Sequence, residues 1–299
     1  MRFFDLHCDS LTECYQQGVP FEDFSGHISL RKGRIFKRWA QVFAIFVPDR
    51  LRGAAAADYL RRVLEFYHTR CAAALARNGC AALLALENGC ALCGDPSQVD
   101  FLAQSRIRMA SLTWNGENEL GSGADCDPKR GLKPAGKETV RRLFAAGILP
   151  DVSHLNEAGF WDVAALWAAQ PATRRLPFLA SHSNCAAIQP HRRNLDDAQL
   201  RAIFAAGGLV GVNLYPAFLG GAGTADAVFR HISQLLALGG ARHLALGSDF
   251  DGASLHKSLA GMEKMPALNQ ALACLGLDEA TREALFWGNA ARVLGNPAL

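Results

Sequence analysis

Hydrophobic positions along the chain fall into eight short runs, separated by segments in which apolar residues recur every three or four positions. Most of the runs have the length and the β-branched, aromatic or Leu-rich composition of buried parallel strands. Each run ends in, or close to, a residue that can bind a metal ion, take a proton or hold a carboxylate. The predicted strands are Phe3–Asp9, Ala40–Val47, Ala81–Glu87, Ile107–Asn115, Ile148–His154, Pro177–Ser183, Gly208–Tyr215 and His243–Asp249.

The segments between the runs are predicted to be helices, because their apolar residues recur at helical spacing among Arg, Glu, Gln and Ala. Strand and helix alternate eight times over 299 residues, which predicts a (β/α)₈ TIM barrel with active-site loops at the carboxyl ends of the strands. A doubly wound open sheet is disfavoured, since no G-x-G-x-x-G follows the first strand. The clearest helices are Tyr59–Leu75, Ala135–Ala146, Glu157–Ala168, Asp196–Ala205 and Ala225–Leu238.

The composition is that of a globular protein with a large core. Half of the residues are hydrophobic and no linker rich in Pro, Ser or Gly divides the chain, so we expect one domain, residues 1–299. The formal net charge of +3 is small and scattered, which argues against a nucleic-acid-binding surface. The one basic cluster is predicted to be a solvated loop and comprises Arg31, Lys32, Arg34, Lys37 and Arg38.

The sequence offers no segment that would carry the protein to a membrane. The start, Met1–Asp5, enters a predicted strand without an apolar leader, and no later stretch approaches the ~20 uninterrupted apolar residues of a membrane span. Nine cysteines, with a single unmatched C-x-x-C at Cys90 and Cys93, are typical of reduced thiols rather than of a disulfide framework or a structural zinc site. We therefore expect a cytoplasmic protein with no membrane partner.

Residues that bind metal ions lie at the ends of several predicted strands. His7 and Asp9 end the first strand, and because side chains at i and i+2 point to the same face, both can reach one ion while Cys8 points away. Glu87 ends the third strand, where an unpaired buried carboxylate would be costly. It needs a cation, and the neighbouring sequence provides no obvious Arg or Lys.

His154 and His182 end the fifth and sixth predicted strands. Imidazoles and carboxylates gathered at one end of a barrel suit a pair of divalent ions, Zn²⁺ above all. Glu87 could bridge two ions ~3.5–4 Å apart, as in two-metal hydrolytic sites. Each residue alone also fits an ordinary hydrogen-bonded role, but together they would be five independent coincidences. The predicted ligands are His7, Asp9, Glu87, His154 and His182.

Two further groups suggest chemistry on a substrate. Asp249, at the end of the eighth strand, could accept a proton from metal-bound water and return it to a leaving amine. Asp251 with Gly252 could instead form a simple turn. Arg193, in the loop after the sixth strand, offers a guanidinium suited to a substrate carboxylate, with an exposed loop arginine as the alternative.

Taken in order, these segments resemble the membrane dipeptidase (renal dipeptidase) family, the M19 metallopeptidases, over nearly the whole chain. The ordered set is far more specific than any one member. Because nothing here supports the secretion, disulfides and lipid anchor of the animal members, the resemblance is to the bacterial soluble type. The matching segments are His7-Cys8-Asp9, Glu87 after an apolar strand, Gly147 to His154, Ser181-His182-Ser183, Arg192-Arg193-Asn194, Gly247 to Gly252 and Gly288 to Leu294.

The resemblance implies a (β/α)₈ barrel with two zinc ions per chain that hydrolyses dipeptides, often including those with a C-terminal D-residue. A hydroxide bridging the two ions would attack the scissile carbonyl. One zinc would be held by His7 and Asp9, the other by His154 and His182, and Glu87 would bridge them.

The resemblance also assigns roles around the metal site. Asp249 and Glu87 would be the catalytic residues, and Arg193 would bind the terminal carboxylate and so limit substrates to dipeptide length. Tyr215 aligns with a substrate-pocket position, although a packing role fits it equally. The candidate substrate-binding residues are Arg193, Tyr215, Trp114 and Asn115.

Two residues depart from the family pattern. Trp114 stands where many members carry a histidine near the substrate, so the contribution of that imidazole must come from elsewhere or be absent. A bacterial subgroup also carries Trp there, so loss of activity does not follow. Asn88 follows Glu87 where Gly is common, which predicts an altered loop without loss of a ligand.

Other functions stay open on the sequence alone. The same scaffold could serve another amidohydrolase-type reaction on an N-acyl amino acid, a lactone or a cyclic amide, because fold does not fix function. A catalytically silent relative that binds a small ligand is the more distant alternative, which retention of every predicted ligand disfavours. Dimers are common in the family, and a homodimer therefore stays open.

Overall fold

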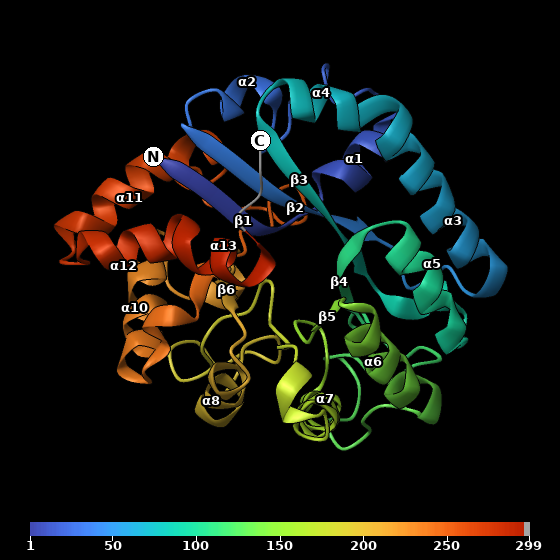
Figure 1. Ribbon diagram of the computed structural model, residues 1–299. Coiled ribbons are helices and arrows are strands. Elements are labelled where there is room, and N and C mark those ends of the chain that lie inside the picture. Colours follow the sequence, from blue (N-terminus) through green and yellow to red (C-terminus); the bar gives the residue numbers. More distant parts are fainter. Residues whose placement is uncertain (296–299) are drawn as a thin grey trace.

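A parallel sheet forms the centre of the computed structural model, which describes residues 1–295. All neighbouring strands pair in parallel, in the order β5-β4-β3-β2-β1-β7-β6. Figure 1 shows the helices around the outside of these strands. The strands are β1 (Arg2–Cys8), β2 (Arg38–Phe46), β3 (Cys80–Glu87), β4 (Ile107–Ser111), β5 (Leu149–Asp151), β6 (Val210–Val212) and β7 (Leu244–Leu246).

The predicted sixth strand, Pro177–Ser183, fills the gap between β5 and β6 but pairs over two residues only. Leu179 bridges Asp151 on one side, and Ala180 bridges Val210 on the other. Beyond Ala180, the backbone amides of the next two residues donate to side chains rather than to a neighbouring strand. Eight segments therefore surround the barrel axis, as the sequence predicted. Within residues 1–295, seven of them are strands and the sixth segment pairs through two isolated bridges.

Apolar side chains fill the barrel below the carboxyl ends of its strands. Trp287 from the C-terminal segment packs against Phe4 of β1, with ring centroids 5.7 Å apart. Each fully buried Leu, Val or Phe contributes roughly 1.5–3 kcal/mol. This inner cluster comprises Phe4, Leu6, Ala40, Val42, Ala85, Met109, Leu149, Leu179, Leu209, Ala245, Trp287, Ala290 and Leu294.

A β-bulge in β1 turns its last residues toward the mouth of the barrel. Pairing with β2 shifts register between Asp5 and Cys8. Leu6 packs in the inner cluster, yet His7 next to it also faces the interior, whereas Cys8 packs in the outer core between strands and helices. A regular strand would place Leu6 and His7 on opposite faces, so the bulge is what brings the imidazole inward.

The helices agree with the sequence analysis where their apolar pattern is strong. Helix α7 has the predicted bounds, and α6, α8 and α10 differ from theirs by a residue at one end. The predicted helix Tyr59–Leu75 begins earlier and is split by a π-helical turn at Tyr67–Cys71. The helices are α1 (Ser10–Gln17), α2 (Leu30–Gly33), α3 (Gly53–Phe66), α4 (Ala72–Arg77), α5 (Val99–Gln104), α6 (Pro134–Ala146), α7 (Glu157–Ala168), α8 (Asp197–Ala205), α9 (Pro216–Leu219), α10 (Ala225–Ala237), α11 (Met265–Cys274), α12 (Glu279–Glu283) and α13 (Asn289–Leu294).

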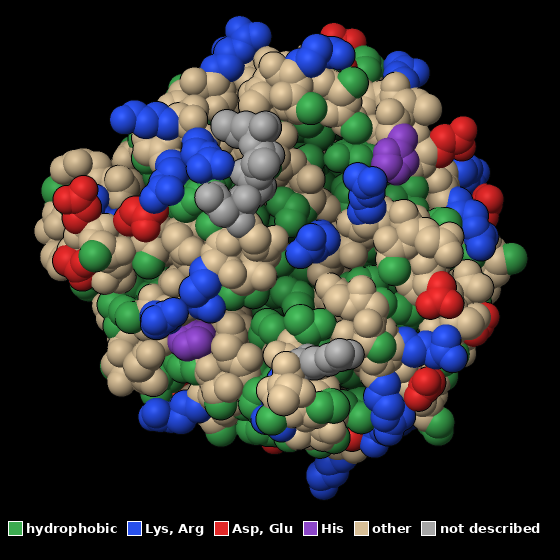
Figure 2. Space-filling model, viewed as in Figure 1, with side chains coloured by type: hydrophobic (Ala, Val, Ile, Leu, Met, Phe, Trp, Pro, Cys, Tyr) green, Lys and Arg blue, Asp and Glu red, His purple; other side chains and the backbone are tan. Residues whose placement is uncertain are grey.

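The predicted basic loop is partly helical. Arg31 and Lys32 belong to the short helix α2, and Arg38 begins β2. Lys32 is engaged locally, since its Nζ lies 3.1 Å from a carboxylate oxygen of Glu263. On the face seen in Figure 2, Lys and Arg side chains are spread out rather than gathered in one patch.

All nine cysteines are free, and most of them are buried. Among the described residues, no helix combines the length and the apolar character needed to cross a lipid bilayer.

Candidate active site

The carboxyl ends of the strands surround a cavity of about 620 Å³. Strand ends far apart in sequence contribute to it, because parallel strands present their carboxyl ends at the same edge. Of the residues singled out from the sequence, those that line it are Asp9, Glu87, Trp114, Asn115, His154, His182, Arg193, Tyr215, Asp249, Asp251 and Gly252. His7 lies immediately beneath, 2% exposed.

Glu87, at the end of β3, lies between two groups of ligand atoms. Its Oε1 is 2.8 Å from Nε2 of His154 and 3.8 Å from Nε2 of His182. Its Oε2 is 3.5 Å from Nε2 of His7. The two oxygens of one carboxylate therefore face different histidines.

The ligand atoms form two sets, each compact enough for one ion. Glu87, His154 and His182 form one, and His7, Asp9 and Asp249 form the other, with the ligand atoms in each set within 4.8 Å of one another. The two sets meet where Nε2 of His7 approaches Glu87.

Buried atoms without partners show where a cation would fit. Nε2 of His7, Oδ1 of Asp9 and Oε2 of Glu87 are buried and make no hydrogen bond within the described part of the chain. A buried polar atom left unpaired costs about 1–3 kcal/mol, and more when charged. Nitrogen and carboxylate donors of this kind are the ligands that divalent ions take, so the residues present fit a metal centre.

The pKa shifts in this cluster follow from burial and from the crowding of carboxylates. Burial opposes charge on His7, but Glu87 and Asp9 raise its pKa well above the usual value. Burial and the charge of Glu87 raise the pKa of Asp9 to about 7. Burial lowers the pKa of His182 well below its usual value and also lowers that of His154. Burial therefore disfavours charge on His154 and His182, whereas the neighbouring carboxylates favour the protonated form of His7.

Arg193 extends into the same cavity from the loop after His182. It is 4% exposed, and burial lowers the pKa of its guanidinium to about 10. Nη2 lies 3.1 Å from Nε2 of His154, whereas Nε and Nη1 are buried without a partner among the described residues. The guanidinium carbon also lies 5.4 Å from the ring centre of Phe218. A buried guanidinium with free donors suits a substrate carboxylate.

Asp249 and Asp251 occupy different environments, although both have a left-handed backbone, with φ of 63° and 65°. Oδ1 of Asp249 is 3.9 Å from Nε2 of His7, and its Oδ2 accepts a hydrogen bond of 3.0 Å from Asn213. Asp251 instead accepts from Ser10 Oγ at 2.5 Å and from the backbone N–H of His27 at 2.6 Å. Asp249 therefore faces the centre, while Asp251 holds a loop.

Gly252 is required where the chain passes these carboxylates. A Cβ on this residue would overlap the carboxylate of Asp9 and would also meet that of Asp249. The close approach of backbone to acid therefore excludes any larger side chain.

Aromatic side chains form the wall beside the histidines. The ring of Trp114 lies 6.1 Å from that of His154 and 5.3 Å from that of Phe46, measured between centroids. Asn115 also lines the cavity, but its Oδ1 lies 2.8 Å from Nδ1 of His154, so it holds the imidazole of a predicted ligand in place. Tyr215 packs edge-on against Phe218, with centroids 5.0 Å apart.

Asn88 has the positive φ of 77° that glycine adopts freely. The side-chain Nδ2 of Asn88 donates to the backbone oxygen of Val47 at 2.8 Å and to Oδ1 of Asp49 at 2.9 Å. Its oxygen accepts from Asn118 at 3.0 Å. Among non-glycine residues Asn tolerates this conformation best, and these bonds fix the loop behind Glu87.

Several residues that support the site were not predicted from the sequence. Asp151 and Ser181 lie directly behind His7 and His182, and Asn213 holds Asp249. Asp151 could have been found from the signal that identified Glu87, an acid at the end of an apolar strand. Ser181 and Asn213 carry no such signal.

Comparisons with known proteins show the family to which this chain is similar. The family model for membrane dipeptidases, peptidase family M19, matches residues 1–298. An uncharacterised protein of Klebsiella pneumoniae is 38% identical over 215 residues, covering 68% of this chain and 77% of that protein. The dipeptidase aclJ of Aspergillus oryzae is 34% identical over 224 residues, covering 72% of this chain and 51% of that protein.

Solved structures give the same result. A metallopeptidase of Rhodobacter sphaeroides, liganded with a phosphinate mimic of the dipeptide L-Ala-D-Ala, has a TM-score of 0.86 and 26% identity, covering 100% of this chain and 99% of that chain. The dipeptidase AC, a metallopeptidase of family M19, has a TM-score of 0.83 and 27% identity, covering 99% and 98%.

The fold and site define a metal-dependent hydrolase of the TIM-barrel class. Within that class, the chain belongs to the membrane dipeptidase family, peptidase family M19, and is a metallo-dipeptidase that hydrolyses peptide bonds. The sequence-based predictions of fold, family and enzyme class are confirmed.

Proposed function

We propose that this enzyme is a zinc dipeptidase with two ions per chain, which accepts dipeptides with a C-terminal D-residue. The proposal rests on the position of Glu87, because its two carboxylate oxygens face different sets of candidate ligand atoms. His7 and Asp9 would hold one ion, and His154 and His182 the other. A Rhodobacter relative crystallised with a mimic of L-Ala-D-Ala supports the substrate class.

Two ions at this position would polarise the scissile carbonyl and make a water molecule nucleophilic near neutral pH. The chain's own residues supply the remaining steps. The carboxylate of Asp249 takes the proton from the attacking water and returns it to the leaving amine. Asn213 keeps that carboxylate aimed at the centre by its 3.0 Å hydrogen bond.

Arg193 would fix the other end of the substrate. Its unpaired donors would bind the terminal carboxylate of a dipeptide and hold the scissile bond beside the ligand sets. A longer peptide has no terminal charge at that distance. Trp114, Phe46 and Tyr215 would contact the side chains of the substrate, since all three line the cavity.

The test is hydrolysis of a panel of L-L and L-D dipeptides by zinc-loaded protein, with the His182→Ala variant as control. We expect turnover by the wild type that is lost in the variant, and the L-D to L-L ratio measures the preference for the C-terminal residue. Zinc-loaded protein that hydrolyses no dipeptide but cleaves an N-acyl amino acid, a lactone or a cyclic amide would refute the proposed substrate.

Replacing Arg193 with alanine is expected to raise KM for dipeptides about 10–100-fold, because a charge-assisted interaction with the terminal carboxylate is lost. The discrimination between dipeptides and tripeptides should also decrease. Initial rates on matched dipeptides and tripeptides measure both effects, and Arg193→Lys, which keeps the charge, should recover part of the affinity. A nearly unchanged KM, with tripeptides cleaved by variant and wild type alike, would show that Arg193 does not bind the carboxylate.

A further inference from the structure

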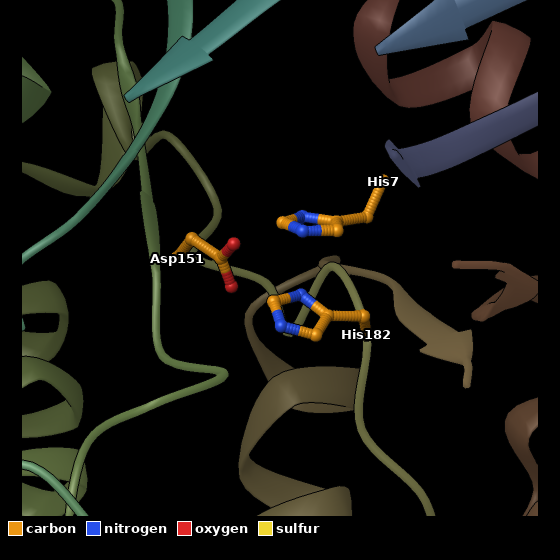
Figure 3. Close-up of side chains that lie close together, drawn as sticks. All are labelled: His7, Asp151 and His182. Carbon is orange, nitrogen blue, oxygen red and sulfur yellow. The ribbon is translucent and has the colours of Figure 1, made fainter. Parts of the chain in front are cut away.

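Behind the ligand sets lies a buried group that no ligand assignment uses. Figure 3 shows the carboxylate of Asp151 directed at the imidazoles of His7 and His182. All three residues are at most 5% exposed, and their candidate ligand atoms lie within 4.8 Å of one another. Taken alone, this grouping has the composition of a third metal site.

The hydroxyl of Ser181 occupies the space that such an ion would need. Ser181 Oγ contacts Oδ2 of Asp151 and lies 2.7 Å from Nδ1 of His182. It lies 3.5 Å from Nδ1 of His7, at the long limit of a hydrogen bond. Asp151 and the two imidazoles are therefore joined by a side chain, and the grouping is a hydrogen-bonded support.

Donor and acceptor rules fix the direction of the bonds that Asp151 makes in this support. Oδ1 of Asp151 accepts from Ser153 N at 3.0 Å, Ser153 Oγ at 2.7 Å and Ser181 N at 3.0 Å. A carboxylate only accepts, so the single hydroxyl proton of Ser181 goes to Oδ2 of Asp151. The oxygen of Ser181 can then only accept from the imidazoles.

It follows that Nδ1 of His182 and Nδ1 of His7 each carry a proton, so the lone pair with which either imidazole can bind a metal ion is the one on Nε2. These Nε2 atoms are the ones that face Glu87, at 3.8 Å and 3.5 Å. A metal ligand needs its free nitrogen directed at the ion, and the hydrogen bond at the other nitrogen selects that tautomer. One hydroxyl thus serves a histidine from each ligand set.

The backbone at Ser181 is held as tightly as its side chain. Ser181 is fully buried, and a Cβ on either Gly211 or Gly247 would overlap its carbonyl oxygen. The neighbouring amide, that of His182, donates to Ser153 Oγ at 3.1 Å. The hydroxyl therefore has a fixed position relative to both imidazoles.

We propose that Ser181, held by Asp151, is a positioning residue that sets the tautomer of His7 and His182 together and so couples the two metal subsites. The inference rests on the two-ion centre proposed above. It assigns Ser181 no contact with substrate or with the reacting atoms.

The test compares metal binding by wild type, Ser181→Ala and Ser183→Ala, measured by competition with a chromophoric zinc chelator. Ser183 is a matched control, because it flanks His182 on the other side, is fully buried, and its Oγ has no hydrogen-bond partner in the described residues. We expect Ser181→Ala to weaken zinc binding about 10–100-fold, as loss of an outer hydrogen bond to a ligand does, and Ser183→Ala to leave it within about threefold.

The Asp151→Asn variant tests the other half of the inference. An amide group at position 151 can donate to Ser181 Oγ, so the hydroxyl proton of Ser181 is no longer held by a carboxylate. Asp151→Asn and Ser181→Ala act through one chain of hydrogen bonds. The double variant should therefore bind zinc only slightly more weakly than whichever single variant has the lower zinc affinity. Additive losses would overturn the coupling through Asp151.

Nitrogen-15 NMR of the metal-free wild type reads the tautomers directly and requires no variant to fold. We expect His182 to carry its proton on Nδ1. A proton on Nε2, or wild-type zinc affinity in Ser181→Ala, would overturn the inference. If the wild type itself binds no zinc, the proposed two-ion centre fails instead, and the NMR result still decides the tautomer assignment.

Discussion

Replacing Glu87 with glutamine is expected to lower kcat/KM for dipeptides at least about 10³-fold, a loss of roughly 4 kcal/mol of transition-state stabilisation. Glutamine keeps the shape of the side chain but not its charge, and it replaces one acceptor oxygen by a donor. Oε1 lies 2.8 Å from His154 and Oε2 lies 3.5 Å from His7, so no orientation of the amide can serve both ligand sets.

Metal analysis separates this explanation from unfolding. We expect the Glu87→Gln variant to retain its circular dichroism spectrum and to hold fewer than two zinc ions per chain after dialysis. Glu138→Gln makes the same change on the surface of α6 and should behave as wild type, because Glu138 pairs there with the exposed Arg141 and Arg142. A Glu87→Gln enzyme with full zinc content and full activity would refute a bridging role.

The sequence predicted the strand ends well because two different physical requirements coincide there. Apolar runs identify buried strands, and an acid or imidazole at the end of such a run would be costly to bury unless a cation or a partner accepts it. Glu87, His154 and His182 satisfy both conditions, and the structure brings all three to one cavity. The order of the strands could also be predicted, because in a (β/α)₈ barrel each strand pairs with the strands that precede and follow it in the sequence.

The bulge in β1 and the short pairing of the sixth segment could not be predicted in this way. They depend on contacts between distant segments, which the spacing of apolar residues in strands and helices does not reveal. The bulge that turns His7 inward is set by pairing of β1 with β2. The short pairing at Leu179 and Ala180 arises because the next amides donate to the side chains of Asp151 and Ser153. Such side-chain contacts join segments about 30 residues apart and appear only once the chain is folded.

The structure shows what the two residues that depart from the family pattern do. Asn88 keeps the positive φ that a glycine would supply and adds hydrogen bonds to Val47, Asp49 and Asn118. Trp114 packs beside His154, and its indole can donate a hydrogen bond but cannot accept a proton. Under the proposed mechanism, we therefore expect proton transfer to depend on the carboxylates that line the cavity.

Among those carboxylates, Asp249 is expected to carry the proton transfer, so Asp249→Asn should lower kcat about 10²–10⁴-fold with little change in KM. The amide cannot take a proton from water, yet it preserves the shape that packs beside Gly252. Zinc content should stay at the wild-type value, since His7 and Asp9 remain. Steady-state kinetics on one dipeptide, with metal analysis of the same sample, measure both quantities.

Asp251→Asn provides the contrast, because Asp251 lies two residues further on and its carboxylate is occupied by Ser10 and His27. We expect this variant to lose thermal stability while kcat per folded molecule falls far less than in Asp249→Asn. Loss of zinc from Asp249→Asn would instead make Asp249 a ligand, as its place in a set with His7 and Asp9 allows. A larger fall in kcat for Asp251→Asn would transfer the catalytic role to Asp251.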